Sequence, residues 1–124
     1  MKRSIGQNKK LGLSRRQGAL FDSFVSGLLL GDAHISKTGS LRIEQSVKRV
    51  GWLRQVKARL AEFGCDARVS TPFQNRVSIG PHNVIRPGLS RMLTTRVYIE
   101  LKAQRKRWYR DSRKIVPKDL SLNA

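Results

Sequence analysis

Apolar residues recur at helical spacing in three segments of this 124-residue chain. The first segment runs from about 15 to 31 and follows Ser14, which begins a capping-box pattern with a glutamine three residues later. The second covers about 50 to 63 and is followed by Gly64, a residue typical of helix C-termini. The third is a charged segment from 97 to about 109. We therefore predict three helices.

The segments between these helices have the shorter period of strands. Leu41 and Ile43 alternate with Arg42 and Glu44 behind a Ser-Lys-Thr-Gly turn, so we expect a hairpin after the first helix. Further strand segments are expected over residues 67–71, 76–79 and 89–95, separated by loops at Pro72, Pro81 and Pro87.

The resulting order of elements, αββαββα, predicts an α+β fold in which helices cover one face of an antiparallel sheet. The chain is long enough for one domain, which we place over 14–124 behind a flexible basic arm at 1–13. The uncovered face of the sheet would be polar and mainly basic, which suits a DNA groove. Its expected members are Arg42, Glu44, Arg68, Ser70, Arg76, Ser78 and Arg91.

Residues 24–33 form an apolar run that ends in a single carboxylate, Asp32. Gly27 and Gly31 are four residues apart, so on a helix they lie on one face, where a second backbone could approach closely. Asp32 would then emerge beside that contact, and the Gly31 carbonyl at the helix end would add a partial negative charge. The expected helix-pairing surface comprises Phe24, Gly27, Leu28 and Gly31.

The composition points to a polyanionic partner. There are 26 Lys and Arg against 8 Asp and Glu, a formal net charge of +18, and self-repulsion of this size disfavours the compact state. Nucleic acid is the first candidate; we expect no membrane, because neither a basic amphipathic helix nor an apolar run of roughly 20 residues is evident. The single cysteine, Cys65, fits a reducing, intracellular compartment, either an organellar matrix or stroma or a bacterial or archaeal cytoplasm.

Four segments, in this order, resemble the LAGLIDADG homing endonucleases. They are Val25–Ala33 for the signature helix, Ser40–Ser46 for the next strand, Trp52-Leu53 in the following helix, and Trp108-Tyr109 with Lys114–Leu120 for the close of a repeat. The signature usually ends in Asp-Gly, whereas Ala33 stands at the glycine position here. The resemblance implies paired signature helices on a two-fold axis, saddle-shaped sheets in the DNA major groove, and sequence-specific double-strand cleavage of a long site.

The resemblance also implies roles for individual residues. The acid at the end of the signature helix, here Asp32, binds a divalent metal, Mg²⁺ with Mn²⁺ as a substitute. Lys114 matches a lysine near the metals, where a cation could polarise water or stabilise developing negative charge. Glu44 and Gln45 match a polar pair of which one orients solvent around the metals, and strand alternation favours Glu44, since Gln45 shares the apolar face. The DNA contacts that we expect are Lys37, Arg42, Arg68, Ser70, Arg76, Arg91 and Arg96.

A single signature in the chain predicts either a homodimer that acts on a near-palindromic DNA target or one half of a longer or split enzyme. Two alternatives stay open. The first is a non-cleaving module on the same fold, such as a degenerate repeat or a maturase whose partner is intron RNA. The second is a basic structural RNA-binding protein such as a ribosomal component, which would not account for Gly27, Gly31 and Asp32 together.

Overall fold

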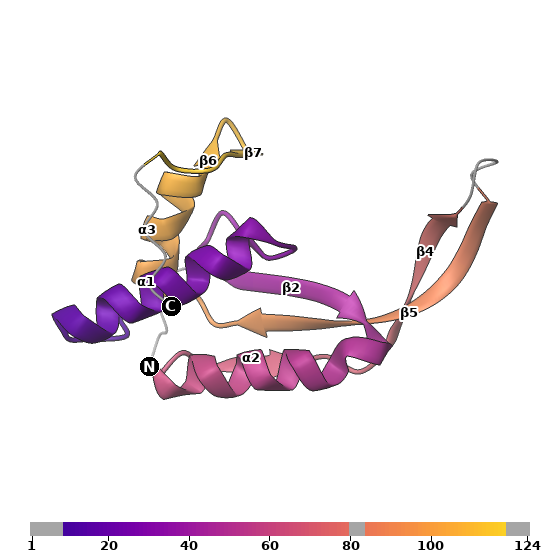
Figure 1. The fold of residues 1–124 in the computed structure, drawn as a ribbon, viewed down its shortest axis with the longest axis horizontal. Coiled ribbons are helices and arrows are strands. Elements are labelled where there is room, and N and C mark those ends of the chain that lie inside the picture. Colours follow the sequence, from indigo (N-terminus) through magenta and orange to yellow (C-terminus); the bar gives the residue numbers. More distant parts are fainter. Residues whose placement is uncertain (1–8, 80–83, 119–124) are drawn as a thin grey trace, which may run out of the picture.

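The computed structural model describes residues 9–79 and 84–118, and it confirms three helices around an antiparallel sheet (Figure 1). The elements are α1 (Arg15–Leu30), β1 (His34–Ile35), β2 (Leu41–Ser46), the short 3-10 helix η1 (Val47–Arg49), α2 (Val50–Glu62), β3 (Ala67–Val69), β4 (Phe73–Ile79), β5 (Val84–Thr95), α3 (Ile99–Trp108), β6 (Tyr109–Arg110) and β7 (Arg113–Lys114). The main sheet has the order β1-β2-β5-β3, and β4 pairs with the other half of β5. None of the described helices has the length and apolarity that crossing a membrane requires.

Helix α1 begins at the predicted capping box and ends just before Asp32. The Gln17 backbone N–H donates to Ser14 Oγ at 3.1 Å, and the Ser14 N–H donates to the Gln17 side-chain oxygen at 3.4 Å. At the other end, the Gly31 N–H donates to the Leu28 carbonyl at 3.1 Å. The buried side of the helix comprises Phe21, Ser23, Val25, Ser26 and Leu29. Burial of this face fixes the direction in which the helix end, and hence Asp32, leaves the body.

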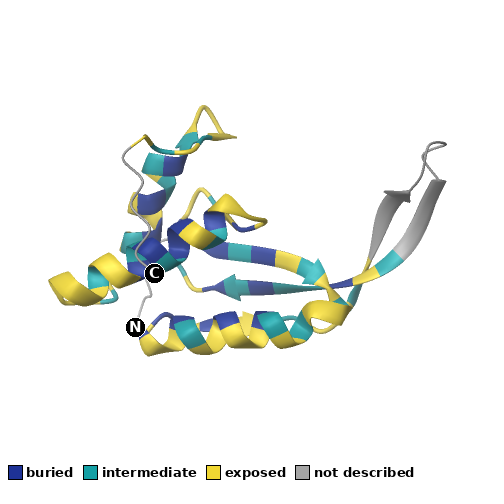
Figure 2. Cartoon of the chain, in the orientation of Figure 1, coloured by how far each residue is buried: buried dark blue, intermediate teal, exposed yellow. Residues whose placement is uncertain are grey.

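The two faces of the sheet follow the alternation that the sequence predicts in β2. Leu41 and Ile43 are fully buried in the core that α1 and α2 also supply, and Ile43 lies opposite the equally buried Leu93 of β5. Figure 2 shows the buried parts of α1, α2, β2 and β5 turned toward one another, and the exposed side of α2 turned outward. Arg42 and Glu44 therefore lie on the face that the helices leave open.

Strand β5 is longer than predicted, because a proline does not end it. We expected a loop at Pro87 and a strand only from residue 89, but β5 begins at Val84 and continues through Pro87. Before Ser90 the strand pairs with β4 and not with β2, so Pro87 lies in a two-stranded ribbon. The side of β5 that faces β2 further along has no strand partner at Pro87 in the described structure, so the missing proline N–H interrupts no hydrogen-bond ladder there. This ribbon extends away from the body in Figure 1. The predicted loop at Pro81 lies outside the described residues.

The break predicted at Pro72 is present as a bulge between β3 and β4. Val69 lies opposite Leu93, whereas Phe73 lies opposite Ser90, so four steps along β3–β4 match three steps along β5. One extra residue on one strand is the defining feature of a β-bulge, which bends and twists the sheet. The β4–β5 ribbon therefore leaves the sheet at an angle.

The second part of the basic arm predicted at 1–13 lies against α3. The Ile99 N–H donates to the Lys9 carbonyl at 2.8 Å, and the Leu11 N–H donates to both carboxylate oxygens of Glu100 at 3.1 Å. Leu11 and Leu13 also pack against the core. Residues 9–13 thus belong to the folded unit, and residues 1–8 lie outside the described part of the chain.

The turn between β1 and β2 gives a test of the packing between the hairpin and α3. Gly39 has φ +103°, and a Cβ there would lie 3.1 Å from both Lys102 Cβ and the Tyr98 carbonyl oxygen. We expect Gly39→Ala to lower the free energy of unfolding by about 1–3 kcal/mol, because backbone strain and overpacking both act against it. Chemical denaturation measures this change.

Gly51→Ala is the matched control. Gly51 lies in α2, and a Cβ at this position would meet nothing within 4 Å. The control should raise the free energy of unfolding by about 0.5–1 kcal/mol, as alanine does in an exposed helix. Equal stabilities of the two variants would contradict the packing described here.

Candidate functional site

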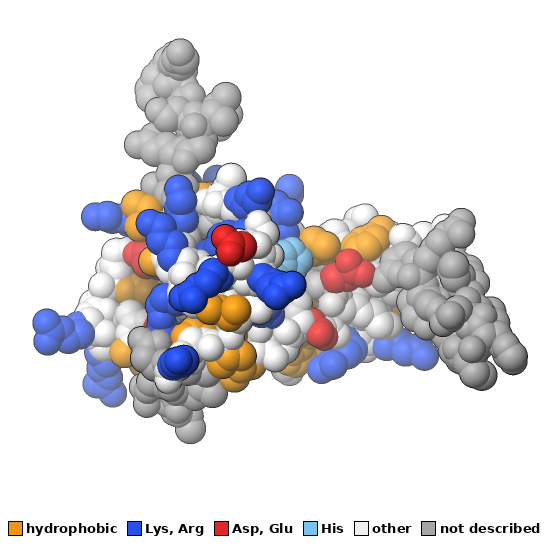
Figure 3. All heavy atoms as spheres, turned by 90° about the horizontal axis from the view of Figure 1, so that it is seen from above, with side chains coloured by type: hydrophobic (Ala, Val, Ile, Leu, Met, Phe, Trp, Pro, Cys, Tyr) orange, Lys and Arg blue, Asp and Glu red, His pale blue; other side chains and the backbone are white. Residues whose placement is uncertain are grey.

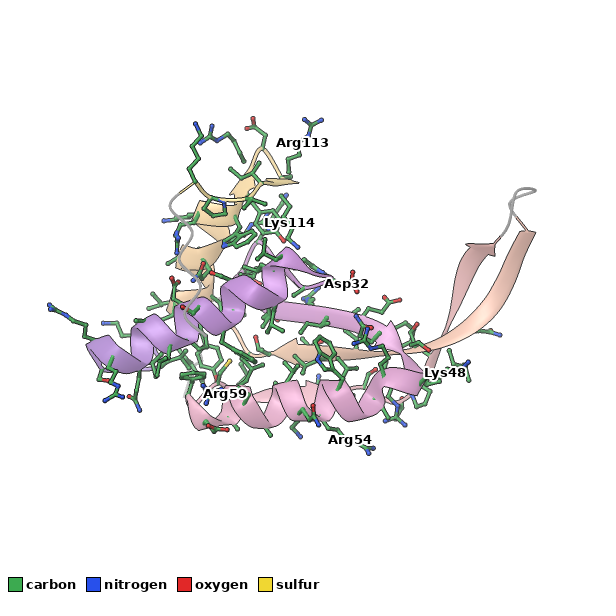
Figure 4. The ribbon with its side chains drawn as sticks, in the orientation of Figure 1. Asp32, Lys48, Arg54, Arg59, Arg113 and Lys114 are labelled. Carbon is green, nitrogen blue, oxygen red and sulfur yellow. The ribbon has the colours of Figure 1, made fainter. Side chains whose placement is uncertain are left out.

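Asp32 lies exposed at the end of α1, where the ends of β2 and β7 also meet (Figure 4). Gln45 Nε2 donates a hydrogen bond of 2.8 Å to Asp32 Oδ2. Lys114 Nζ donates to the Gly31 carbonyl at 3.2 Å and to the Ala33 carbonyl at 2.6 Å, the two carbonyls that flank Asp32. The structure thus brings together Asp32, Gln45 and Lys114 from three distant parts of the sequence.

Gln45, and not its neighbour, is the member of the polar pair that hydrogen-bonds to Asp32. Strand alternation had favoured Glu44 for this place, because Gln45 shares the face of the buried Leu41 and Ile43. Side chains of β2 alternate between the two faces as predicted. At the end of β2, however, the face covered by the helices lies next to the end of α1, so Gln45 on that face reaches Asp32. Glu44 is exposed on the open face, opposite Met92 of β5.

The β6–β7 hairpin positions Lys114. Asp111 and Ser112 form its two-residue turn, and both have positive φ, 52° and 63°, as in a type I′ turn. Lys114 pairs with Tyr109 in this hairpin. Partial burial lowers the pKa of the Lys114 ammonium, and the charge of Asp32 acts in the opposite direction. A cation is therefore held beside the carboxylate by backbone pairing and by two carbonyl acceptors.

Arg105 and Tyr109, which the sequence pattern did not single out as site residues, hold the backbone that follows Asp32. The Ile35 N–H donates to the Tyr109 hydroxyl at 3.1 Å, and Arg105 donates to the Ile35 carbonyl. The Arg105 guanidinium carbon also lies 4.2 Å from the centroid of the Tyr109 ring, a cation–π contact. Their four-residue spacing at the end of the third predicted helix indicates that the two side chains lie on one side of that helix. It does not reveal which strand they contact.

His34 lies two residues beyond Asp32 and reports the electrostatic environment. Burial lowers the pKa of its imidazole, and the positive charges of Arg42, Lys114 and Arg105 lower it further, while Glu44 opposes them. The imidazole is therefore mostly uncharged at pH 7. The same cations would favour a phosphate group beside the end of α1.

A metal ion at Asp32 would need ligands beyond those that the described residues gather. Among the described residues, no three His, Cys, Asp or Glu side chains gather closely enough to bind a metal ion. Asp32 offers a carboxylate of which one oxygen accepts from Gln45, and the Gly31 carbonyl already accepts from Lys114. Mg²⁺ commonly takes one or two carboxylates together with water and phosphate oxygens. The Asp32 carboxylate fits such a site, provided that the other ligands come from outside the described chain.

The open face of the sheet carries a basic row. Arg42 of β2 and Arg68 of β3 both lie opposite Thr94 of β5, one on each side of it. Arg91 does not belong to this row: it lies opposite Gln45 and two residues before the buried Leu93, so it shares the helix-covered face. The expectation that Arg91 points from the open face is therefore wrong, because the pairing register sets the opposite parity for β5.

The other predicted DNA-contacting residues differ in their surroundings. Lys37 is exposed in the β1–β2 turn. Arg96 Nε donates to Asp66 Oδ2 at 2.9 Å, in an exposed ion pair that contributes little to the stability of the fold. Ser70 Oγ accepts from the Met92 N–H at 3.0 Å within the bulge. The side chains of Arg76 and Ser78 lie outside the described residues.

The predicted pairing surface of α1 is open in this chain. Gly27 and Gly31 are exposed, and Phe24 and Leu28 are half-buried. A Cβ at Gly27 would meet nothing within 4 Å, so the packing described here does not itself require glycine at that position. The Phe24 and Phe63 ring centroids are 6.3 Å apart, and both Phe24 and Leu28 pack against the core, so the exposed part of this surface is centred on the two glycines.

Comparisons with known proteins agree with this arrangement of helices and sheet. Residues 22–123 match the model of the LAGLIDADG DNA endonuclease family. A curated protein of Methanocaldococcus jannaschii, named uncharacterized protein MJ1098, is 38% identical over 102 residues, which cover 82% of this chain and 37% of that protein. The chain thus spans little more than a third of that relative.

The fold also matches a solved structure. The homing endonuclease I-WcaI bound to its DNA recognition sequence superposes with a TM-score of 0.54 at 16% sequence identity, over 86% of this chain and 43% of that one. A likeness at this identity supports the fold, and the family match over most of the chain confirms the resemblance found in the sequence. The chain belongs to the LAGLIDADG DNA endonuclease family.

Proposed function

We propose that this chain is one subunit of a divalent-metal-dependent endonuclease that makes double-strand breaks in DNA at a long, specific site. The observation that carries the proposal is the 2.8 Å hydrogen bond between Gln45 and Asp32 at the end of α1, with Lys114 on the flanking carbonyls. Family membership supports a nuclease of this class, and the solved homing endonuclease of similar fold is bound to DNA.

Asp32 would hold Mg²⁺ or Mn²⁺ through its carboxylate, and we retain the Gly31 carbonyl as a second donor. When bound, the metal ion neutralises charge at the phosphate that is attacked. Gln45 fixes the orientation of the Asp32 carboxylate by its amide N–H and keeps its own carbonyl oxygen for a hydrogen bond from water. Lys114 places a positive charge where negative charge develops during hydrolysis.

DNA would lie on the open face of the sheet. Arg42 and Arg68 form a basic row there, and the net charge of +18 supplies long-range attraction to phosphates. Two α1 helices would pair along the strip at Gly27 and Gly31, so that two Asp32 carboxylates meet and serve one strand each. A symmetric dimer reads the same sequence in both halves of its site, so the target would be near-palindromic.

Asp32→Asn tests the metal site. We expect this variant to lose cleavage of a pool of duplex DNA targets in Mg²⁺ or Mn²⁺, because an amide binds these ions poorly. DNA binding should stay nearly intact or become stronger, since a negative charge near the phosphates is removed. Gel electrophoresis of the products and a binding titration measure the two effects.

The exposed carboxylate Glu62, at the end of α2, provides the control variant Glu62→Gln, which should cut like the parent. Unchanged cleavage by Asp32→Asn would refute the metal site proposed here. A parent chain that binds DNA or intron RNA but leaves every pooled target uncut would favour the non-cleaving module on the same fold.

Gly27→Leu tests the pairing of α1 helices. Leucine is a better helix former than glycine, and a Cβ at this exposed position meets no atom within 4 Å, so the folded subunit should keep its stability. We expect the variant to sediment as a monomer and to lose cleavage together with dimerisation. Gly51→Leu, on the exposed side of α2, is the control and should remain dimeric. A Gly27→Leu protein with the parent's sedimentation and activity would exclude this interface.

Lys114→Gln tests the cation beside Asp32. We expect the cleavage rate at saturating DNA to fall by about 10²–10³-fold, the usual loss when a group that stabilises developing charge is removed. Arg113→Gln is the control, because the neighbouring strand residue points to the other side of β7 (Figure 4). Rates come from single-turnover cleavage assays, and equal rates for both variants would remove Lys114 from the catalytic site.

A further inference from the structure

A hollow of about 290 Å³ lies between the β1–β2 turn, the exposed side of α3 and the turn of the β6–β7 hairpin. Its lining is dominated by four cations and includes one carboxylate. The cations are Lys37, Lys102, Arg105 and Lys106, the carboxylate is Asp111, and Tyr109 also lines the hollow. Figure 3 shows Lys and Arg side chains gathered over the end of the molecule that holds α3 and the β6–β7 hairpin.

The described lining of this hollow carries more positive than negative charge, because four cations stand against the carboxylate of Asp111. Lys102, Arg105 and Lys106 are three and four residues apart, so they lie on one side of α3, and like charges at this spacing destabilise a helix. The ammonium groups of Lys37, Lys102 and Lys106 make no ion pair or hydrogen bond within the part of the chain that the structure describes. An anion from outside would offset this repulsion.

The walls of the hollow are fixed before any ligand binds. The Tyr98 N–H donates to the Gly39 carbonyl at 3.2 Å, and the turn packs so closely on α3 that a Cβ at Gly39 would lie 3.1 Å from Lys102 Cβ. The Arg105 guanidinium stacks on Tyr109 and donates to the Ile35 carbonyl. Its remaining N–H groups are still available, because a guanidinium has five. A preorganised fork beside several ammonium groups matches the acceptor oxygens of a phosphate.

We propose that this hollow binds backbone phosphates of the DNA, outside the centre where the strand is cut. Tyr109 lines the hollow, while its hydroxyl accepts from Ile35, three residues after Asp32, and its strand partner is Lys114. The hollow is thus joined to the candidate cleavage centre by one hairpin. Each DNA strand carries one phosphate for about every 3.4 Å of helix axis, so a strand that reaches Asp32 has further phosphates close by. The assignment to DNA rests on the proposed function.

The test is the salt dependence of DNA binding, measured on the full chain with Asp32→Asn so that the duplex stays intact. Adding Lys37→Gln or Lys106→Gln should weaken binding. The slope of log K, the DNA association constant, against log salt is negative, and its magnitude should fall by about 0.9 for each phosphate that the protein no longer neutralises. Lys57→Gln is the control, because Lys57 is exposed on α2, away from this hollow. If the slope of the control falls as much as that of the hollow variants, the effect comes from the overall charge of the protein and not from this hollow. That result would overturn the proposal.

Two further arms separate other ligands from DNA. Inorganic phosphate that raises the melting temperature of the parent but not of Lys106→Gln, with unchanged slopes on DNA, would assign the hollow to free phosphate. A reduced slope on duplex RNA alone would assign it to RNA. Both results overturn the proposal. If the chain with Asp32 in place cuts no DNA, but the hollow variants show the reduced slope and Lys57→Gln does not, the phosphate site stands and the nuclease proposal fails by itself.

Discussion

The contact between Lys114 and the residues directly after α1 is the interaction on which the site depends. The C-terminal end of a helix carries a partial negative charge, so an aspartate directly after it is unfavourable. Lys114 offsets this by donating to the carbonyls of Gly31 and Ala33, which are more than 80 residues away in the sequence. Gln45 donates to the Asp32 carboxylate itself. The fold therefore keeps an exposed carboxylate at a place where a helix alone would disfavour it, as expected of a functional site.

The hairpin that carries Lys114 also helps to tie the third helix to the first strand. Lys114 belongs to a short hairpin whose other strand contains Tyr109, and Tyr109 with Arg105 holds the backbone of Ile35. The residues on both sides of Asp32 are thus fixed by one supporting unit, α3 with β6 and β7. This unit also forms the basic hollow, so the positions of the carboxylate and of the proposed phosphate site are linked through the same side chains.

Most of the fold was predictable because it follows from local patterns. The capping box at Ser14 placed the start of α1, and the alternation of Leu41 and Ile43 identified the two faces of β2. Strand β5 was predicted too short, because the effect of Pro87 depends on whether a neighbouring strand needs its N–H. Arg91 was placed on the wrong face, because its side depends on the pairing of β5 with β2.

The sequence by itself determined the three helices, the family, and Asp32 as the acid at the end of the signature helix. Its periodicity and short motifs reflect interactions between residues close in the chain. They can therefore be recognised without knowing which distant segment packs against them. Only the tertiary structure decided that Gln45 meets Asp32, that Lys114 binds the flanking carbonyls, and that Lys37 and Lys106 line one hollow. Each of these depends on how distant segments pack together, which a pattern along one segment does not record.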